Sequence, residues 1–329
     1  PQYNAINQYM GEGGLDGQGD FVLYHAVVDN VFRYESKDFN HLDYWTLQSQ
    51  QNYLEGSLMT PYLGSHDVSR LISRLDSDTN NQDHKWIEQG LPQQPSSSQP
   101  YVKAKTAFSW LLTIPGVPVL YMGDEYGEYG GSDPDNRHPF RQIDELNSNE
   151  KGLLSSVQEL GMLRSNLTDL QKGLYRSLFS DSNLLVFSRE TSDSQTLVLI
   201  NSGEGSREVS LNKGDDIFYH NFLDVRNNLS ISAVDDSLSF AVNSNDFSIY
   251  RSTSQIITDD SSDNNIDNST DATDNETHES DDNLSDPLIN ENNETKNDDK
   301  EEDSNSDTLL NGNLDGGDVQ RDDSDSQTS

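Results

Sequence analysis

Three short apolar runs in the first half of the chain predict buried β-strands. They cover Asp20–Val28, Leu58–Leu63 and Val117–Tyr121. Each run is shorter than an ordinary helix and is bounded by polar or turn-forming residues, a pattern typical of strands buried on both faces.

Between these runs the spacing of apolar residues changes to that of helices. Mixed polar and aromatic residues over 40–56 favour one helix. A second helix is predicted where apolar residues recur at i, i+3, i+4, i+7 and i+8, and Pro115-Gly116 ends it. Its inner face consists of Ala104, Ala107, Phe108, Leu111 and Leu112. A third helix places Leu153, Val157 and Leu160 inward.

Strands that alternate with helices predict an α/β fold with parallel strands. Two of the predicted strands end in polar clusters, His66-Asp67 and Asp124-Glu125. Ligand sites in α/β folds lie at the carboxyl ends of the strands. These clusters are therefore the first indication of a functional site.

From about Tyr175 onward, short apolar runs separated by turn residues predict a small antiparallel β-sandwich over residues 175–254. The predicted strands are Leu184–Phe187, Thr196–Ile200, Ile217–Tyr219, Leu238–Val242 and Phe247–Tyr250.

Residues 255–329 predict a disordered acidic tail. They consist mainly of Asp, Asn, Ser, Glu and Thr, with 24 acidic residues against 3 basic ones. Such a segment buries too little apolar surface to offset the entropy lost on ordering. We interpret it as a solvated tail or linker, with a specific binding motif as the alternative.

The charge of the chain argues against several classes of partner. A formal net charge of −37 disfavours nucleic acid and anionic membrane surfaces. The absence of cysteine excludes disulfides and Cys-ligated metal sites. The folded part is also acidic and poor in lysine, which is typical of a protein that stays hydrated at high salt, as in a halophile. An ordinary acidic extracellular protein is the alternative.

Three motifs together carry a resemblance to a known family. They are Tyr62–Arg70 (YLGSHDVSR), Gly116–Tyr126 (GVPVLYMGDEY) and Gly130–Phe140 (GGSDPDNRHPF). In this order and spacing, over roughly residues 1–250, the chain closely resembles the carboxyl-terminal part of the α-amylase family of glycoside hydrolases, which includes cyclomaltodextrinases and neopullulanases. The resemblance implies the C-terminal part of a (β/α)8 TIM barrel over 1–174, a β-sandwich over 175–254 and the tail over 255–329. The three predicted strands would be the sixth, seventh and eighth of the barrel.

The resemblance also implies roles for four residues. Asp67 would be the third acid, assisting the nucleophile and the general acid, and His66 would contact hydroxyls of the sugar at the cleavage point. A carboxylate accepts from sugar hydroxyls and an imidazole N–H donates, and such bonds tighten in the oxocarbenium-like transition state. Asp133 and Arg137 would hold a glucose unit further away.

Structural alternatives stay open for these residues. His66 could instead anchor its loop, and Arg137 could simply pair with Asp133 or Asp135. For Asp124 and Glu125 a structural role in the Gly-Asp-Glu turn is favoured over lining the cleft floor.

The nucleophile and the acid/base of the family are absent from these motifs. If Asp20–Val28 is the sixth strand, the aspartate and the glutamate both belong before Pro1. Glu12 is a weak candidate for the glutamate because no apolar strand precedes it, and Asp16 and Asp20 are interpreted as turn residues. Three of eight strands cannot close a barrel and expose two sheet edges and half an apolar core. We therefore expect a fragment that is inactive alone and lacks the N-terminal half of its barrel.

The sequence thus predicts an α-glucan hydrolase, acting on starch or maltodextrin by a retaining mechanism. A non-catalytic carbohydrate-binding or interaction relative, or an inactive degenerate fragment, is the alternative. The expected partner is an α-glucan oligo- or polysaccharide, with no nucleic acid and no membrane insertion. No cofactor is firmly expected; calcium is a weak expectation. A polymeric substrate favours an extracellular location, with the cytoplasm as the alternative.

Overall fold

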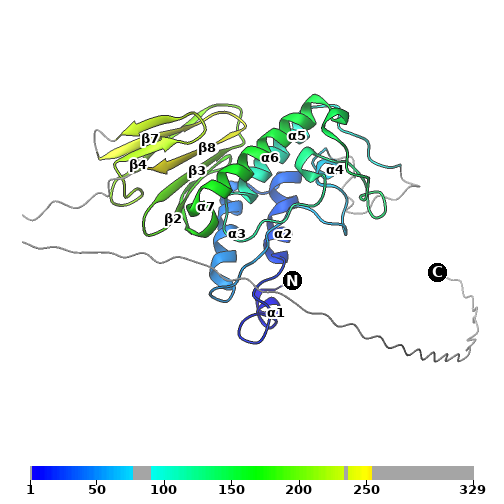
Figure 1. Cartoon of the computed structure of the whole chain (residues 1–329), viewed down its shortest axis with the longest axis horizontal. Helices are drawn as coiled ribbons and strands as arrows, with labels where there is room; N and C mark the ends of the chain where they lie inside the picture. Colours follow the sequence, from blue (N-terminus) through cyan, green and yellow to red (C-terminus); the bar gives the residue numbers. More distant parts are fainter. Residues whose placement is uncertain (1, 77–89, 233–235, 254–329) are drawn as a thin grey trace, which may run out of the picture. The chain divides into compact units, whose positions relative to one another are not determined.

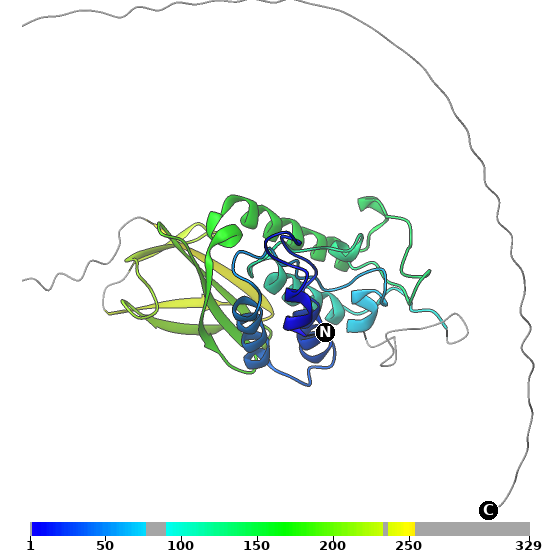
Figure 2. The ribbon, with the colours of Figure 1, turned by 90° about the horizontal axis from the view of Figure 1, so that it is seen from below.

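The computed structural model describes residues 2–76, 90–232 and 236–253. Within these residues, helices gather against one face of an antiparallel sheet (Figures 1 and 2). The predicted tail at 255–329 lies outside the described residues. The boundaries predicted at 174 and 254 stay a prediction.

Helices dominate the first 172 residues. The described ones are α1 (Tyr3–Asn7), α2 (Phe21–Val27), the π-helix η1 (Val28–Arg33), α3 (Phe39–Asn52), α4 (Leu71–Leu75), α5 (Gln99–Leu111), the short 3-10 helices η3 (Asp124–Tyr126) and η4 (Ile143–Glu145), α6 (Ser148–Asn166) and α7 (Thr168–Lys172). The three predicted helices are confirmed as α3, α5 and α6. No helix among these described residues is both long and apolar enough to cross a bilayer.

Local sequence explains where α5 and α6 begin. Pro100 occupies the first turn of α5, where a missing backbone N–H costs nothing. Asn147 and Glu150 form a reciprocal capping box at the start of α6. The predicted inner residues of both helices, from Ala104 to Leu112 and Leu153, Val157 and Leu160, are buried in the main core.

The predicted strand over Asp20–Val28 is wrong. These residues form α2 and the start of η1, and the Asp20 carboxylate caps α2 by accepting a hydrogen bond from the Leu23 N–H at 3.0 Å. Val27 and Val28 are buried while His25 is exposed, as on a helix. An apolar run of this length does not distinguish a strand from a buried helix by periodicity.

Three extended segments lie side by side in parallel, at 16–20, 58–62 and 117–119. The first two are joined by hydrogen bonds from Leu58 N to Asp16 O (2.9 Å) and from Asp20 N to Thr60 O (3.1 Å). The second and third are joined by bonds from the N–H groups of Val117 and Val119, both at 2.9 Å. The parallel direction and the order are as predicted, but the segments pair only through isolated bridges. The first segment, at 16–20, comes before most of the strand that was predicted over Asp20–Val28.

The described chain leaves part of the apolar surface of these segments exposed. Five apolar side chains in or next to the second and third segments are 36–58% exposed, namely Leu58, Val117, Val119, Leu120 and Met122. Burial on both faces is therefore not observed.

Residues 174–252 form two antiparallel sheets. The larger contains, in order, β1 (Leu174–Ser180), β2 (Leu184–Glu190), β3 (Gln195–Asn201), β8 (Asp246–Ser252), β5 (Asn221–Asp224) and β6 (Leu229–Ser232); the smaller pairs β4 (Arg207–Asn212) with β7 (Ser237–Val242). Four of the five predicted strands correspond to β2, β3, β7 and β8. The fifth, Ile217–Tyr219, is wrong: the chain reverses at Gly214, whose N–H bonds to Ile217 O at 2.9 Å, so Ile217 closes a turn instead.

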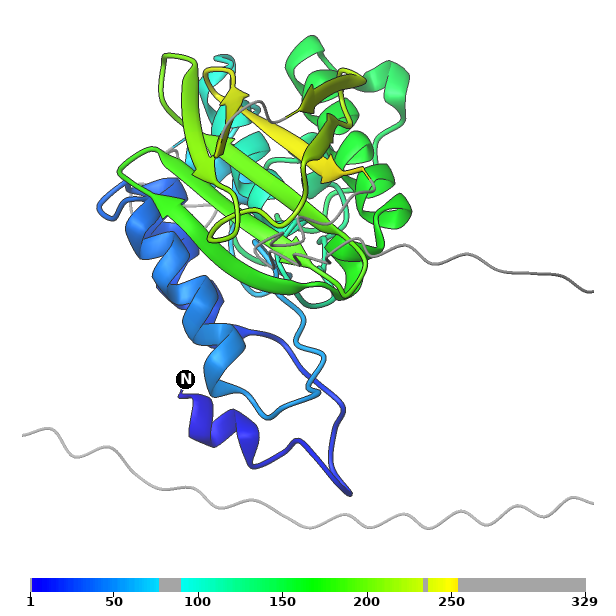
Figure 3. The same cartoon turned by 90° about the vertical axis from the view of Figure 1, so that its left-hand side faces the viewer.

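Period-two alternation places the larger sheet between two apolar layers. Leu185 and Phe187 of β2 belong to the core shared with α3 and α5, whereas Leu184 and Val186 face the core shared with β4 and β7. Figure 3 shows the sheet in front of the helices. The helical part and the sheet therefore share one continuous core.

Candidate functional site

His66 and Asp67 form an exposed turn directly after the second parallel segment. Their side chains are 57% and 77% exposed, and His66 Nε2 lies 3.3 Å from Asp67 Oδ1. The Asp67 backbone N–H donates to Ser65 Oγ at 3.2 Å, which fixes the turn. Both side chains are thus open to a ligand at the carboxyl end of the segment, where the sequence predicts them.

Asn136 ties this turn to the loop that follows the third segment. Its side chain is fully buried, and Nδ2 donates to His66 O at 2.7 Å and to Val68 O at 2.9 Å. Asn136 is not among the site residues predicted from the sequence. Its position inside the Gly130–Phe140 motif was the available signal, because a buried amide there can satisfy backbone carbonyls that no strand pairs.

A second anchor joins the same two loops nearby. The backbone N–H of Arg70 donates to Gly130 O at 3.0 Å, and the backbone N–H of Gly130 donates to Ser73 Oγ at 3.0 Å. Arg70 is itself buried, and its guanidinium lies 4.3 Å from the centroid of the Tyr121 ring. Residues 65–73 and 130–136 are therefore fixed relative to each other.

Asp124 is buried beneath this pair of loops. Arg70 Nη1 lies 3.3 Å from Asp124 Oδ1 and also donates to Met122 O. Gly64 leaves room for the carboxylate, since a Cβ there would meet Asp124 Oδ2 at 2.8 Å. Burial raises the pKa of Asp124 to about 7, and Arg70 only partly opposes this rise. Such a buried, paired carboxylate supports the structural role that the sequence favours for Asp124.

Asp133 and Arg137 form an exposed ion pair. Arg137 Nε donates to Asp133 Oδ1 at 2.7 Å, and the side chains are 56% and 48% exposed for Asp133 and Arg137 respectively. The hydrogen bond to Asp133 is the main cause that raises the pKa of Arg137, and the charge of Asp67 adds to it. The four predicted residues therefore occupy two loops within electrostatic reach of each other.

A partly buried network of charged side chains connects the second loop to the start of α6. His138 lies between Glu128 and Asp135, with its Nδ1 3.0 Å from Glu128 Oε1 and its Nε2 3.2 Å from Asp135 Oδ1. Arg141 then bridges Glu128 (2.7 Å) and Glu150 (2.5 Å) at the start of α6. The sequence did not predict this network, since its contacting pairs are 3 to 13 residues apart and follow no single period.

Glu12 and Asp20 lie elsewhere. Glu12 is exposed in a turn that precedes the first parallel segment, at the opposite end from His66 and Asp67. Asp20 is buried at the start of α2, where its carboxylate accepts from Tyr53 Oη at 2.7 Å. Its interpretation as a turn residue is corrected: it is a helix cap within a buried polar cluster.

The site can hold hydroxyl-rich ligands through exposed groups of both kinds. Asp67 and Asp133 offer acceptors, whereas Arg137 and the imidazole of His66 offer donors. Among the residues that the structure describes, no group of three or more His, Asp or Glu side chains could hold a metal ion, so we derive no role for calcium.

The chain is similar to several known proteins. A family model described as the alpha amylase catalytic domain matches residues 1–166. A beta/alpha-amylase of Paenibacillus polymyxa is 26% identical over 203 residues, covering 62% of this chain and 15% of that protein. Neopullulanase 2 of Thermoactinomyces vulgaris is 36% identical over 111 residues, covering 33% of this chain and 18% of that protein. The chain spans less than a fifth of the length of these two relatives.

Solved structures of known proteins have a fold similar to that of this chain. The α-amylase of Geobacillus thermoleovorans complexed with acarbose superposes with a TM-score of 0.61 at 22% identity, covering 76% of this chain and 51% of that chain. AmyP in complex with maltose gives 0.64 at 19% identity, covering 78% and 55%. The fold of this chain therefore corresponds to about half of these proteins.

Proposed function

The chain belongs to the α-amylase family of glycoside hydrolases, and from this premise we propose that it supplies one side of the catalytic cleft of an α-glucan hydrolase. The relatives are named as amylases, a neopullulanase and cyclomaltodextrinases, all enzymes of this family. Two of the solved relatives carry maltose or acarbose. The proposed substrate is an α-linked glucose polymer or oligomer.

One observation carries the proposal. Buried Asn136 joins the His66–Asp67 turn to the Asp133–Arg137 loop through two hydrogen bonds to backbone carbonyls. Exposed polar side chains on two loops are thereby held in fixed relation at the carboxyl ends of neighbouring parallel segments. Precise placement of this kind is what a cleft needs in order to bind a transition state better than a substrate.

Asp67 is proposed to accept hydrogen bonds from hydroxyls of the sugar at the cleavage point. These bonds strengthen as positive charge develops on the sugar ring. His66, at 3.3 Å from Asp67, would donate to a neighbouring hydroxyl of the same sugar. Asp133 and Arg137 would exchange part of their mutual ion pair for hydrogen bonds to a more distant glucose.

Retaining hydrolysis also needs a nucleophile and an acid/base whose carboxyl groups lie about 5–5.5 Å apart. We place both on barrel strands other than the three parallel segments of this chain. Under the proposal, this chain stabilises the transition state and binds substrate, and bond cleavage depends on residues that complete the barrel.

The test replaces Asp67 in a protein whose barrel is complete. The coding sequence upstream of Pro1 is read first, for an aspartate and a glutamate at successive strand ends, and the complete protein is then expressed. Asp67→Asn should lower kcat/KM on maltooligosaccharides by about 10³-fold, since it removes interactions worth several kcal/mol in the transition state.

Asp144→Asn is the matched control, because Asp144 is an exposed carboxylate of η4 outside the two loops. It should leave kcat/KM within about twofold of the wild type. Full activity of the Asp67→Asn enzyme would refute the proposal. Absence of both upstream acids would favour a non-catalytic carbohydrate-binding relative.

A further inference from the structure

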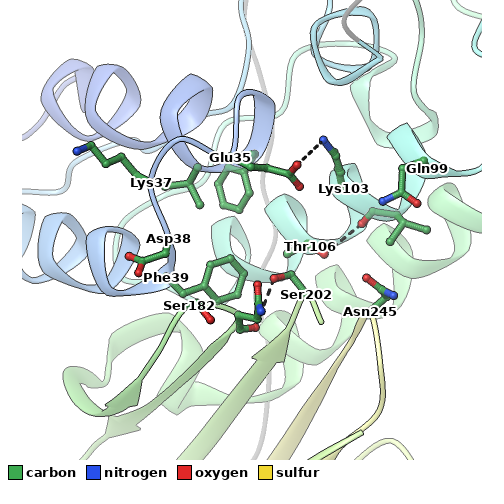
Figure 4. Close-up of a pocket in the computed structure, with 14 residues that line it drawn as sticks. Glu35, Lys37, Asp38, Phe39, Gln99, Lys103, Thr106, Ser182, Ser202 and Asn245 are labelled. Carbon is green, nitrogen blue, oxygen red and sulfur yellow. Dashed lines mark hydrogen bonds and ion pairs between the residues drawn. The ribbon is translucent and has the colours of Figure 1, made fainter. Parts of the chain in front are cut away.

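A second hollow lies between the helical part and the turns of the larger sheet, away from the strand-end loops. This hollow, here called the η1–α5 pocket, has a volume of about 400 Å³ and is shown in Figure 4. Its walls come from the end of η1, the start of α3, one face of α5 and three turns of the two sheets. None of its lining residues belongs to 64–73 or 122–141, so it is distinct from the proposed cleft.

Polar groups without partners converge on this pocket. The side chains of Gln99, Ser182 and Asn183 make no hydrogen bond within the described part of the chain. Figure 4 shows Gln99, Ser182 and Asn245 approaching the hollow from three different elements. Amides and hydroxyls that both donate and accept are the groups that bind neutral hydroxyl-rich ligands.

The floor of the pocket is apolar and rigid. Phe32 and Phe39 are only 3% and 4% exposed, and both belong to the main core. Val31 and Val102 complete this surface. An apolar floor beneath a rim of amides and hydroxyls matches a sugar ring, which presents C–H groups on its face and hydroxyls at its edge.

The pocket is electrically balanced in a strongly acidic chain. It contains two acids, Glu35 and Asp38, and two of the chain's few lysines, Lys37 and Lys103. Lys103 Nζ lies 3.2 Å from Glu35 Oε2, and the Asp38 carboxylate caps α3 at the His41 N–H. This balance favours a neutral ligand over an anion or a cation.

Unusual backbone geometry occurs at the edge of the pocket. Glu35 and Asn245 adopt φ of +52° and +51°, the left-handed region that side chains other than glycine rarely occupy. Glu35 follows the end of η1, and Asn245 lies in the turn between β7 and β8, where asparagine occupies this region more readily than most residues. These two turns set the course of the backbone at the pocket edge.

From these observations we infer that the η1–α5 pocket is a second, non-catalytic saccharide site. Its volume lies in the lower part of the range for ligand pockets and suits a short oligosaccharide. The assignment of α-linked glucose rests on the proposed function, whereas the preference for a neutral sugar rests on the pocket alone. The site would hold an α-glucan on the enzyme independently of cleavage.

The test measures binding of maltotriose to the 329-residue chain by isothermal titration calorimetry. We expect saturable binding that the double variant Gln99→Ala/Asn183→Ala weakens by about tenfold, since each of its substitutions removes a side chain that can hydrogen-bond to the sugar. Both side chains are exposed and unbonded, so the fold should persist, which circular dichroism checks. Gln8→Ala/Asn166→Ala is the matched control, because it removes exposed amides outside the pocket and should leave the affinity unchanged.

Asp67→Asn separates the two sites. Unchanged maltotriose affinity in this variant supports the pocket, whereas loss of binding there but not in Gln99→Ala/Asn183→Ala would overturn it. Absence of saturable binding would overturn it too, and equal affinity for β-linked cellotriose would overturn the assignment to α-linked glucose. Binding at the pocket together with an inactive complete barrel would refute the proposed function and leave this inference standing.

Discussion

Asp124 shows how one buried carboxylate beside the candidate site sets a pH dependence. Burial raises its pKa to about 7, from an ordinary value of 3.8, although Arg70 Nη1 lies 3.3 Å away. Desolvation of the charged form therefore outweighs the attraction of the guanidinium. Between pH 4 and pH 7 the native state binds a proton at this position that the unfolded state has released, so its contribution to stability falls as the pH rises.

Asp124→Asn should remove this dependence of the free energy of unfolding on pH. A shift of about three pKa units corresponds to roughly 4 kcal/mol in the free energy of unfolding across that interval. Urea unfolding of the wild type and the variant at half-unit steps from pH 4 to 7.5 measures it, and parallel curves would contradict the prediction. Asp181→Asn is the control with the opposite sign: hydrogen bonds, chiefly from Arg207, outweigh burial and lower the pKa of Asp181, so its contribution is lost only as the pH falls below about 4.

At the scale of elements, Asp20 connects the first parallel segment to two helices. Its backbone N–H bonds to Thr60 O at 3.1 Å, and its carboxylate accepts from the Leu23 N–H at the start of α2. The same carboxylate accepts from the hydroxyls of Ser49 and Tyr53 near the end of α3. Burial, helped by the Asp20 charge, raises the pKa of Tyr53, which keeps this hydroxyl a donor.

Asp20→Ala should lower the free energy of unfolding by about 3 kcal/mol, because it removes a cap and leaves two buried hydroxyls without an acceptor. Asp38→Ala is the matched control: Asp38 caps α3 in the same way, but it is exposed and accepts a longer bond of 3.3 Å. The control should cost about 1 kcal/mol. Urea midpoints measure both variants, and equal costs would show that the buried cluster adds nothing to the cap.

At the scale of the whole molecule, the exposed apolar side chains of the parallel segments favour self-association. Five of them, from Leu58 to Met122, are 36–58% exposed. The net charge of −37 opposes association at low salt. Salt screens this repulsion, since the Debye length falls from about 10 Å at 0.1 M to about 3 Å at 1 M.

We therefore expect the 329-residue chain to self-associate more strongly at 1 M than at 0.1 M NaCl, as measured by sedimentation velocity. Leu58→Glu/Val119→Glu should reduce association at 1 M NaCl, because it places charge among the exposed apolar side chains of the parallel segments. Met162→Glu/Leu174→Glu adds the same charge at exposed apolar positions elsewhere and should change little. A chain that stays monomeric in both salts, or equal effects of the two variants, would contradict this account.

Helical periodicity and motif spacing determined much of this protein without tertiary information. The stripe from Ala104 to Leu112 predicted α5, because 3.6-residue spacing specifies a buried face, and short apolar runs such as Leu184–Phe187 predicted strands of the larger sheet. The motifs placed His66 and Asp67 in one strand-end turn, and Asp133 with Arg137 in another loop, because the order of parallel segments follows the order of the chain.

Tertiary structure alone decided the rest. Whether Asp20–Val28 forms a strand or a helix depends on a cap and on buried partners, Ser49 and Tyr53, that lie about thirty residues away. The role of Asn136 depends on two backbone carbonyls some seventy residues earlier, and the η1–α5 pocket on five separate segments. The periodicity of apolar residues shows which residues are buried, but it does not show which distant residues they pack against. The site depends on those distant contacts.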